Sequence, residues 1–234
     1  YYYSNNYFNL FKFKNKISVI RYMEIPNYDC NHNISSKYQQ LYPFMPRDNF
    51  RLLIAGPSGS GKTNTLMHML SVPLIKFDKL YLYAKNLEQG KYRDLMGQFD
   101  RISRQVGYPV MECSNDEIIP VDDMDSDSQK VIIFDDFVCD KVQKPLIDYF
   151  IRGRHKNCSV IYLSQSFYKT PKDIRLNCSH FCIYEFPSSN EKSLITRELG
   201  VSKKQYEKAT SLPYSFMYID KPMKKIKRNF YGIL

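Results

Sequence analysis

The chain has 234 residues, a length that suits one large α/β domain with extensions, and its formal net charge of +10 favours an anionic partner, nucleic acid before a membrane surface. Its six cysteines lack the spacing of a disulfide framework, and no apolar run approaches the length of a transmembrane helix. The composition therefore excludes a small disulfide-stapled fold, argues against a membrane-spanning protein, and predicts an intracellular protein that is not secreted.

Three parts are expected along the chain: an N-terminal extension at 1–42, partly disordered or packed on the surface, a central domain at 43–213, and a basic C-terminal hairpin or tail at 214–234. Short apolar runs predict strands at 51–55, 79–84, 110–113, 131–134, 159–163 and 181–184. Helical spacing predicts helices at 63–71, 87–99, 145–152, 190–200 and 202–210. The terminal hairpin is expected to pair 214–219 with 226–231.

The alternation of strands and helices predicts an α/β fold with a mostly parallel sheet and helices on both faces. Ligands in such sheets bind outside the carboxyl ends of the strands. The main polar motifs of this sequence directly follow predicted strands, so we expect their side chains to meet at one edge of the sheet.

A phosphate-binding loop follows the first predicted strand, because its residues match the pattern G-x-x-x-x-G-K-[ST] completely. Glycines let backbone N–H groups wrap around phosphates, and the next helix presents its positive N-terminus to the same anion. Lys62 is expected to reach the β- and γ-phosphates of ATP, and the Thr63 hydroxyl to ligate Mg²⁺. The residues predicted to bind nucleotide are Gly56, Pro57, Ser58, Gly59, Ser60, Gly61, Lys62, Thr63 and Asn64.

Two adjacent acids, Asp135 and Asp136, directly follow the predicted strand at 131–134 and indicate a Walker B motif. Asp135 is predicted to hold Mg²⁺, and Asp136 to polarise the attacking water. Gln165 follows the strand at 159–163 and suits a γ-phosphate sensor, because its amide can both donate and accept. In P-loop ATPases of the additional-strand type, the strand that carries such a sensor lies between the P-loop strand and the Walker B strand.

Basic residues gather at two further places. Arg152 and Arg154 are candidates for an arginine that stabilises the transferring phosphate of a neighbouring subunit, with Arg175 behind them. From Lys221 onward the chain carries five positive charges and no acid, and this stretch is predicted to contact DNA phosphates without reading sequence. Those charges are Lys221, Lys224, Lys225, Lys227 and Arg228.

Two other clusters have simpler interpretations than a metal site. Cys178, His180 and Cys182 lie in a predicted strand without a second ligand pair, and are interpreted as buried, reduced side chains. The acidic stretch at 116–127 lacks the glycine and the terminal glutamate of a calcium loop, and is interpreted as a solvated loop.

Taken together, these motifs resemble the FtsK–HerA superfamily of P-loop ATPases, and more closely the poxvirus-type genome-packaging ATPases of large DNA viruses, virophages and Polinton-like elements. The segments that carry the resemblance are GPSGSGKTNTL at 56–66, VIIFDDF at 131–137, GRHKNCSVIYLSQS at 153–166 and RLNCSHFCIYEF at 175–186. The resemblance implies a RecA/FtsK-like P-loop NTPase that forms a hexameric or pentameric ring. Such a ring uses ATP and Mg²⁺ to pump double-stranded DNA into a capsid, with a capsid protein as a further partner and no membrane partner. It implies location in the host cytoplasm, at a viral factory, or in the virion.

Other functions stay open at this point. Many superfamily members have Asp-Glu where this chain has Asp135-Asp136, and no separate DNA-binding module is visible. A HerA-type or conjugation-type translocase or helicase would share these motifs. So would a P-loop NTPase without DNA-pumping activity, or a nucleotide-binding module that no longer hydrolyses. A GTPase is disfavoured because no Asn-Lys-x-Asp motif occurs, and a nucleotide kinase because Asp-Asp is not its usual Walker B pair.

Overall fold

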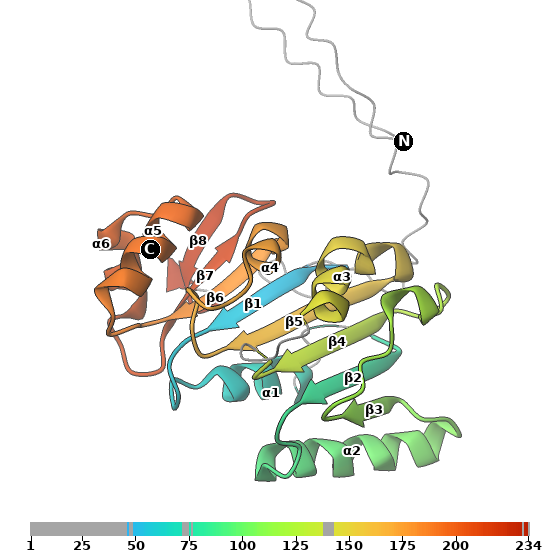
Figure 1. Ribbon diagram of the computed structural model, residues 1–234. Coiled ribbons are helices and arrows are strands. Elements are labelled where there is room, and N and C mark those ends of the chain that lie inside the picture. The colour runs from blue at the N-terminus through green and yellow to red at the C-terminus, as the bar shows by residue number, and fades with distance from the viewer. Residues whose placement is uncertain are drawn as a thin grey trace, which may run out of the picture. The chain divides into compact units, whose positions relative to one another are not determined.

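Figure 1 shows the computed structural model of the chain, which describes residues 46, 49–71, 75, 77–137, 143–230 and 232–233. All of these residues belong to one compact unit, Ser35–Leu234. The N-terminal extension expected at 1–42 lies outside the described residues. Within the described ranges, no helix combines the length and the apolar character needed to cross a bilayer.

A nine-stranded sheet forms the centre of the unit, with the strand order β3-β2-β4-β5-β1-β6-β7-β8-β9. Neighbouring strands from β3 to β6 pair in parallel, and β6 to β9 pair antiparallel. The strands are β1 (Arg51–Ala55), β2 (Lys79–Ala84), β3 (Met111–Ser114), β4 (Lys130–Asp135), β5 (Cys158–Ser164), β6 (His180–Tyr184), β7 (Phe216–Asp220), β8 (Lys225–Arg228) and β9 (Gly232–Ile233). The predicted α/β fold with a mostly parallel sheet is confirmed, and β5 is the additional strand between β1 and β4.

Helices cover both faces of this sheet, as Figure 1 shows. They are α1 (Lys62–Ser71), α2 (Gly90–Val106), α3 (Lys144–Arg152), α4 (Lys172–Asn177), α5 (Ser189–Leu199) and α6 (Lys203–Thr210), with 3₁₀ turns η3 (Val121–Asp123) and η4 (Gly153–Lys156). Side chains of α1 and α2 share one apolar cluster with the sheet, and side chains of α3 to α6 share the other. This two-sided burial explains why the central strands are continuous apolar runs rather than alternating ones.

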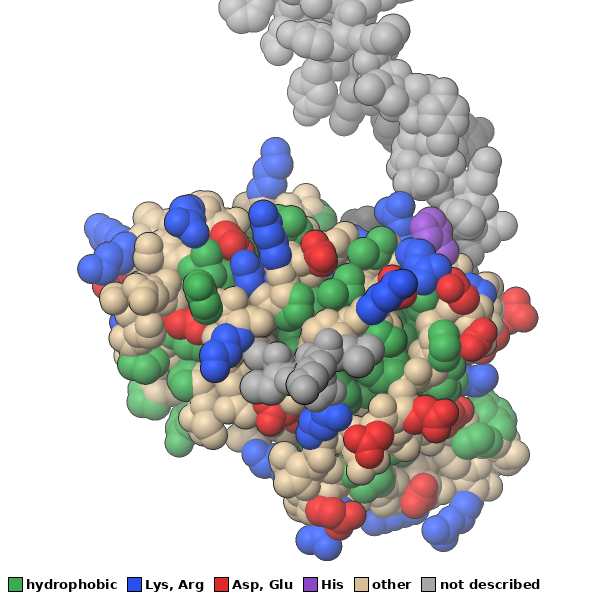
Figure 2. All heavy atoms as spheres, in the orientation of Figure 1, with side chains coloured by type: hydrophobic (Ala, Val, Ile, Leu, Met, Phe, Trp, Pro, Cys, Tyr) green, Lys and Arg blue, Asp and Glu red, His purple; other side chains and the backbone are tan. Residues whose placement is uncertain are grey.

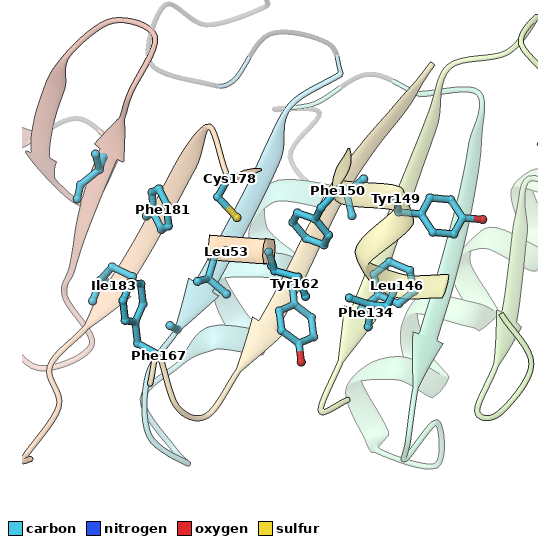
Figure 3. Close-up of a cluster of buried hydrophobic side chains, with 14 of the residues drawn as sticks. Leu53, Phe134, Leu146, Tyr149, Phe150, Tyr162, Phe167, Cys178, Phe181 and Ile183 are labelled. Carbon is cyan, nitrogen blue, oxygen red and sulfur yellow. The ribbon is translucent and has the colours of Figure 1, made fainter. Parts of the chain in front are cut away.

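The cluster under α3 illustrates the packing. In Figure 3, Leu146, Tyr149 and Phe150 of α3 lie over Phe134 of β4 and Tyr162 of β5. Phe134 and Tyr149 have ring centroids 5.6 Å apart, within the range of favourable aromatic pairs. Such packing holds β4 and β5 rigidly beside each other, which matters because both strands end at the site described below.

Three differences from the sequence expectations have local causes. The helix expected at 87–99 runs instead from Gly90 to Val106, and Gly107 ends it with a positive φ of 82° and an N–H bond to the Ser103 carbonyl. The last turns of this helix bury no apolar side chain, so periodicity gave no sign of them. The short α4 and β9 were not predicted, because neither is long enough to show a period.

The cysteines expected in one strand lie apart, because Cys178 follows α4 and precedes β6, whereas Cys182 lies within β6. Cys178 packs in the cluster under α3 and α4, and Cys182 in the cluster with α1 and α2. Both are buried, as predicted, and burial raises the pKa of the Cys178 thiol to about 12. Two thiols on opposite faces of a sheet cannot share one metal ion.

Candidate nucleotide-binding site

The predicted site residues meet at the carboxyl edge of the parallel strands because of the sheet register. Ala55 of β1 pairs with Ser164 of β5, and Leu163 of β5 pairs with Asp135 of β4. Two backbone bonds continue this alignment beyond the strands: Gly56 N–H donates to the Ser164 carbonyl at 3.1 Å, and Asp136 N–H to the Leu163 carbonyl at 3.5 Å. The phosphate loop therefore begins at the same edge of the sheet at which Asp135, Asp136 and Gln165 lie.

The loop after β1 has the backbone shape that the motif predicts. Gly59 and Gly61 have φ values of 77° and 106°, a region that suits glycine. A Cβ on Gly56 would lie 2.6 Å from the Cβ of Tyr184 on β6, so the loop packs directly against that strand. Asn64, in the first turn of α1, is exposed. These constraints hold the loop compact at the N-terminus of α1.

Lys62 is buried within this loop, with 8% of its surface exposed. Its Nζ donates to the carbonyl oxygens of Gly56 at 2.7 Å and Pro57 at 2.9 Å. Burial lowers the pKa of Lys62, and the nearby carboxylates of Asp135 and Asp136 oppose that effect. The ammonium group can bind phosphate oxygens and the carboxylates can bind a divalent cation, so the site suits a phosphate that carries a metal ion.

Asp135, Asp136 and Gln165 form the acidic side of the site. The Gln165 amide Nε2 donates to Asp136 Oδ1 at 3.2 Å, so the predicted sensor and the predicted water-polarising acid are direct partners. Asp136 has a φ of 64°, a left-handed conformation that aspartate tolerates better than most residues. As a result of this backbone turn, Asp135 is partly buried whereas Asp136 is exposed.

Tyr92 of α2 completes the site, and the sequence analysis missed it. Its buried phenol donates to Asp135 Oδ2 at 2.5 Å and lies within hydrogen-bonding reach of Thr63. Burial raises the pKa of Asp135, and the Tyr92 bond acts against that rise by favouring the carboxylate. Tyr92 therefore orients one predicted magnesium ligand and sits beside the other.

The protein groups present fit a triphosphate with its magnesium ion. Within the described part of the chain, no group of three or more His, Cys, Asp or Glu side chains could hold a metal unaided. Mg²⁺ in nucleotide sites takes one or two protein oxygens together with phosphate oxygens, and the Thr63 hydroxyl with the Asp135 carboxylate supplies such a pair. In the loop itself, the Ser60 hydroxyl is buried and has no hydrogen-bond partner.

The predicted arginines do not join this site. Arg152, the last residue of α3, and Arg154 of η4 lie at the amino edge of the sheet, opposite the phosphate loop. Arg152 pairs with Asp122 at 2.7 Å and with Asp148 at 3.2 Å, whereas Arg154 is exposed. Neither arginine can reach the phosphate loop of its own chain.

Arg175 is hydrogen-bonded within its own chain. Its Nε and Nη2 bind both carboxylate oxygens of Glu198 at 2.8 and 3.0 Å. Its Nη1 donates to the carbonyls of Phe167, Tyr168 and Thr170. These bonds occupy the guanidinium within its own chain, so the expectation that Arg175 could serve a neighbouring subunit is wrong.

The C-terminal cations divide into two groups. Lys221, Lys224 and Lys225 are exposed in and beside the turn between β7 and β8, at the amino edge of the sheet. On β8, Arg228 donates to the Lys208 carbonyl and the Ser211 hydroxyl, and Lys227 Nζ reaches the Phe230 carbonyl at 3.4 Å. In the described part of the chain, the side chains of Lys224 and Lys225 have no hydrogen-bond or ion-pair partner, whereas Lys221 Nζ lies 4.6 Å from the centre of the Phe181 ring.

The fold and this arrangement of loop, acids and sensor are those of a P-loop NTPase. The chain belongs to the family described as Poxvirus A32 protein, whose model matches residues 37–217. The resemblance noted in the sequence is thereby confirmed at the level of the family.

Individual relatives agree with the family. The DNA packaging protein OPG160 of Vaccinia virus strain Copenhagen is 30% identical over 165 residues, which cover 67% of this chain and 60% of the relative. The Monkeypox virus protein of the same name is also 30% identical over 165 residues, covering 67% of this chain and 54% of the relative. The chain thus spans only 54–60% of the length of these curated relatives.

A solved structure shows the same fold. The genome packaging NTPase B204 from Sulfolobus turreted icosahedral virus 2, in complex with ATP-gammaS, matches with a TM-score of 0.56 and 17% identity. The match covers 80% of this chain and 98% of that chain. The complex of B204 with AMP gives a TM-score of 0.57 at 16% identity. At this identity the likeness concerns the fold alone.

The contact between Tyr92 and Asp135 predicts a specific effect on metal binding. Tyr92→Phe keeps the ring in the core but removes the hydrogen bond that orients the carboxylate. We expect Mn²⁺ affinity in the presence of ATP, measured by electron paramagnetic resonance, to fall roughly tenfold to a hundredfold, the usual effect of losing a bond to a metal ligand. Tyr218→Phe, which removes a buried hydroxyl without a hydrogen-bond partner, is the control and should leave the affinity unchanged. Equal or tighter Mn²⁺ binding by Tyr92→Phe would show that the phenol does not position Asp135 for the metal.

Proposed function

We propose that this chain is an ATP-hydrolysing, DNA-translocating motor that packages double-stranded viral DNA into a capsid. The observation that carries the proposal is the shared edge of β1, β4 and β5. There, buried Lys62 in the phosphate loop faces Asp135 and Asp136, and Gln165 binds Asp136 directly. The names of the relatives, which are DNA packaging proteins, favour packaging over the other translocase functions that share these motifs.

Each residue has a role that follows from its position. The loop N–H groups and Lys62 bind the β- and γ-phosphates and neutralise charge as it develops during transfer. Thr63 and Asp135 hold Mg²⁺, which when bound polarises the phosphate oxygens. Asp136 orients the attacking water and accepts its proton, because it is the exposed acid beside the phosphate site. Gln165 fixes the Asp136 carboxylate and responds to the presence of the γ-phosphate.

The segment after Gln165 offers a route from the nucleotide to the rest of the chain. Ser166 Oγ and the Tyr168 N–H both donate to the Glu191 carboxylate of α5, at 2.5 and 2.9 Å. Arg175 binds three carbonyls of the same segment and also Glu198 at the other end of α5. A shift of Gln165 on hydrolysis would therefore pull on α5 through these hydrogen bonds to Glu191 and Arg175.

A ring of identical subunits, hexameric or pentameric, is part of the proposal. Arg154 is exposed at the amino edge, where a neighbouring subunit's nucleotide could meet it, and we take it as the better candidate for catalysis in trans. Arg152 is the weaker one, because Asp122 and Asp148 already bind it. The proposal also includes docking on a capsid protein, in the host cytoplasm or in the virion.

DNA contact is assigned to the amino edge. Figure 2 shows Lys and Arg side chains along the side of the molecule that carries the ends of α3 and α4 in Figure 1. We name Arg51, Lys221, Lys224 and Lys225 the amino-edge cations. Burial lowers the pKa of Lys221, and the nearby charge of Arg51 lowers it further. Among the described residues, none of the four pairs with an acid within ion-pair distance, so their charges remain available to a phosphate backbone.

The nucleotide site yields the direct test of hydrolysis. Lys62→Ala should lower ATP hydrolysis at least about a hundredfold, because it removes the charge that stabilises the transferring phosphate. Asp136→Asn should still bind ATP but turn over about 10²–10⁴-fold more slowly, because an amide cannot accept the proton of water. Asparagine tolerates the positive φ of this position, so the unfolding temperature should not change. Hydrolysis at the parent rate by Asp136→Asn would contradict the role given to this acid.

The amino-edge cations yield the test of DNA contact. The double variant Lys224→Glu with Lys225→Glu should bind linear duplex more weakly, and the slope of log affinity against log salt should fall by about 2, since each lost phosphate contact contributes about 0.9. Fluorescence anisotropy at several salt concentrations measures both quantities. The control, Arg101→Glu with Arg104→Glu, makes the same charge change on exposed positions of α2. Equal losses in the two variants would mean that net charge, and not this surface, determines binding.

A further inference from the structure

The direction in which a nucleotide lies on this site follows from the strand order. This step rests on the proposed function, because it takes the phosphate loop to bind a nucleoside triphosphate. The residues that would act on the γ-phosphate follow β4 and β5, on one side of β1. The nucleoside must then extend to the other side of β1, toward β6 and β7.

Two tyrosines stand there against the phosphate loop. Tyr184 ends β6, and its hydroxyl shares a hydrogen bond of 2.5 Å with the Thr65 hydroxyl of α1. Tyr214 precedes β7, and its Cδ1 lies 3.6 Å from the position a Cβ on Gly61 would take. Tyr184 is buried, whereas Tyr214 is 74% exposed, the highest value among the large apolar side chains in the described ranges. An aromatic ring is thus held beside the phosphate loop with most of its surface open.

The backbone fixes Tyr214 in that place at an energetic cost. Leu212 to Ser215 form a turn in which the Ser215 N–H donates to the Leu212 carbonyl at 3.0 Å. The Ser215 hydroxyl closes the turn a second time, donating to the same carbonyl at 2.7 Å. Tyr214, the third residue of the turn, has a φ of 59°, a conformation that this position normally fills with glycine. Strained, over-determined positions of this kind gather at ligand sites.

We propose that Tyr214 stacks on the base of the bound nucleotide. Its ring lies on the side of the loop to which the nucleoside points, and its exposed face offers the flat apolar surface that a base requires. Leu212, 54% exposed in the same turn, extends this surface. Stacking uses the π-face that every base has, so the contact raises affinity for nucleoside triphosphates without choosing between ATP and GTP.

The test compares ligands with and without a base. Tyr214→Gly removes the ring and suits the positive φ, so its unfolding temperature should equal or exceed that of the parent. Its affinity for ATP, measured by calorimetry, should fall roughly tenfold to a hundredfold, the range reported by alanine substitution of stacking rings. Its affinity for inorganic tripolyphosphate should stay at the parent value. Tyr214→Phe keeps the ring and should bind both ligands as the parent does.

Three results would overturn the inference. Parent-like ATP affinity in Tyr214→Gly would show that the ring does not contact the base. Equal losses for ATP and tripolyphosphate would show that Tyr214 acts on the phosphate loop instead. Loss of ATP affinity in Tyr214→Phe would show that the hydroxyl, not the ring, is needed. A parent protein that binds neither ligand would reject the nucleotide site itself, and with it the proposed function.

Discussion

The parallel register of β4, β5 and β1 is the constraint on which the rest of the structure depends. It sets Asp135 beside Leu163 and Ser164 beside Ala55, so three separate loops leave the sheet at one edge. Parallel strands need burial on both faces, and the apolar clusters on the two sides of the sheet supply it. Asp135, Asp136 and Gln165 each lie within one position of a strand end, and Lys62 and Thr63 lie at the start of α1, directly after the phosphate loop.

Opposite edges of the same sheet carry opposite kinds of surface. The carboxyl edge gathers a buried lysine, two acids and an amide within a compact loop structure, which suits a small, highly charged ligand. The amino edge carries the half-buried Arg51 of β1 and exposed lysines of the β7–β8 turn, which suit an extended polyanion. The strands between them are rigid, so movement is more readily passed through the segment after Gln165, where Glu191 and Arg175 bind the backbone.

The sequence predicted the central strands and the phosphate loop because continuous apolar runs and a complete motif are local signals. It also placed Asp136 and Gln165 after strand ends, and the parallel register brings them together in a hydrogen bond of 3.2 Å that no local signal specified. Tyr92 could not be found in this way, since its partner Asp135 is 43 residues distant along the chain. Tyr214 gave no signal either, because only its φ and its exposed ring distinguish it from an ordinary turn residue.

The most direct test is the rate of ATP hydrolysis by the unaltered chain, with and without linear double-stranded DNA, at low and at high salt. Phosphate contacts weaken steeply as salt rises, whereas the buried nucleotide site is screened far less. The account predicts strong stimulation by duplex DNA at low salt that fades at high salt, while the rate without DNA changes little. Hydrolysis that is the same with and without duplex at both salt concentrations would contradict it.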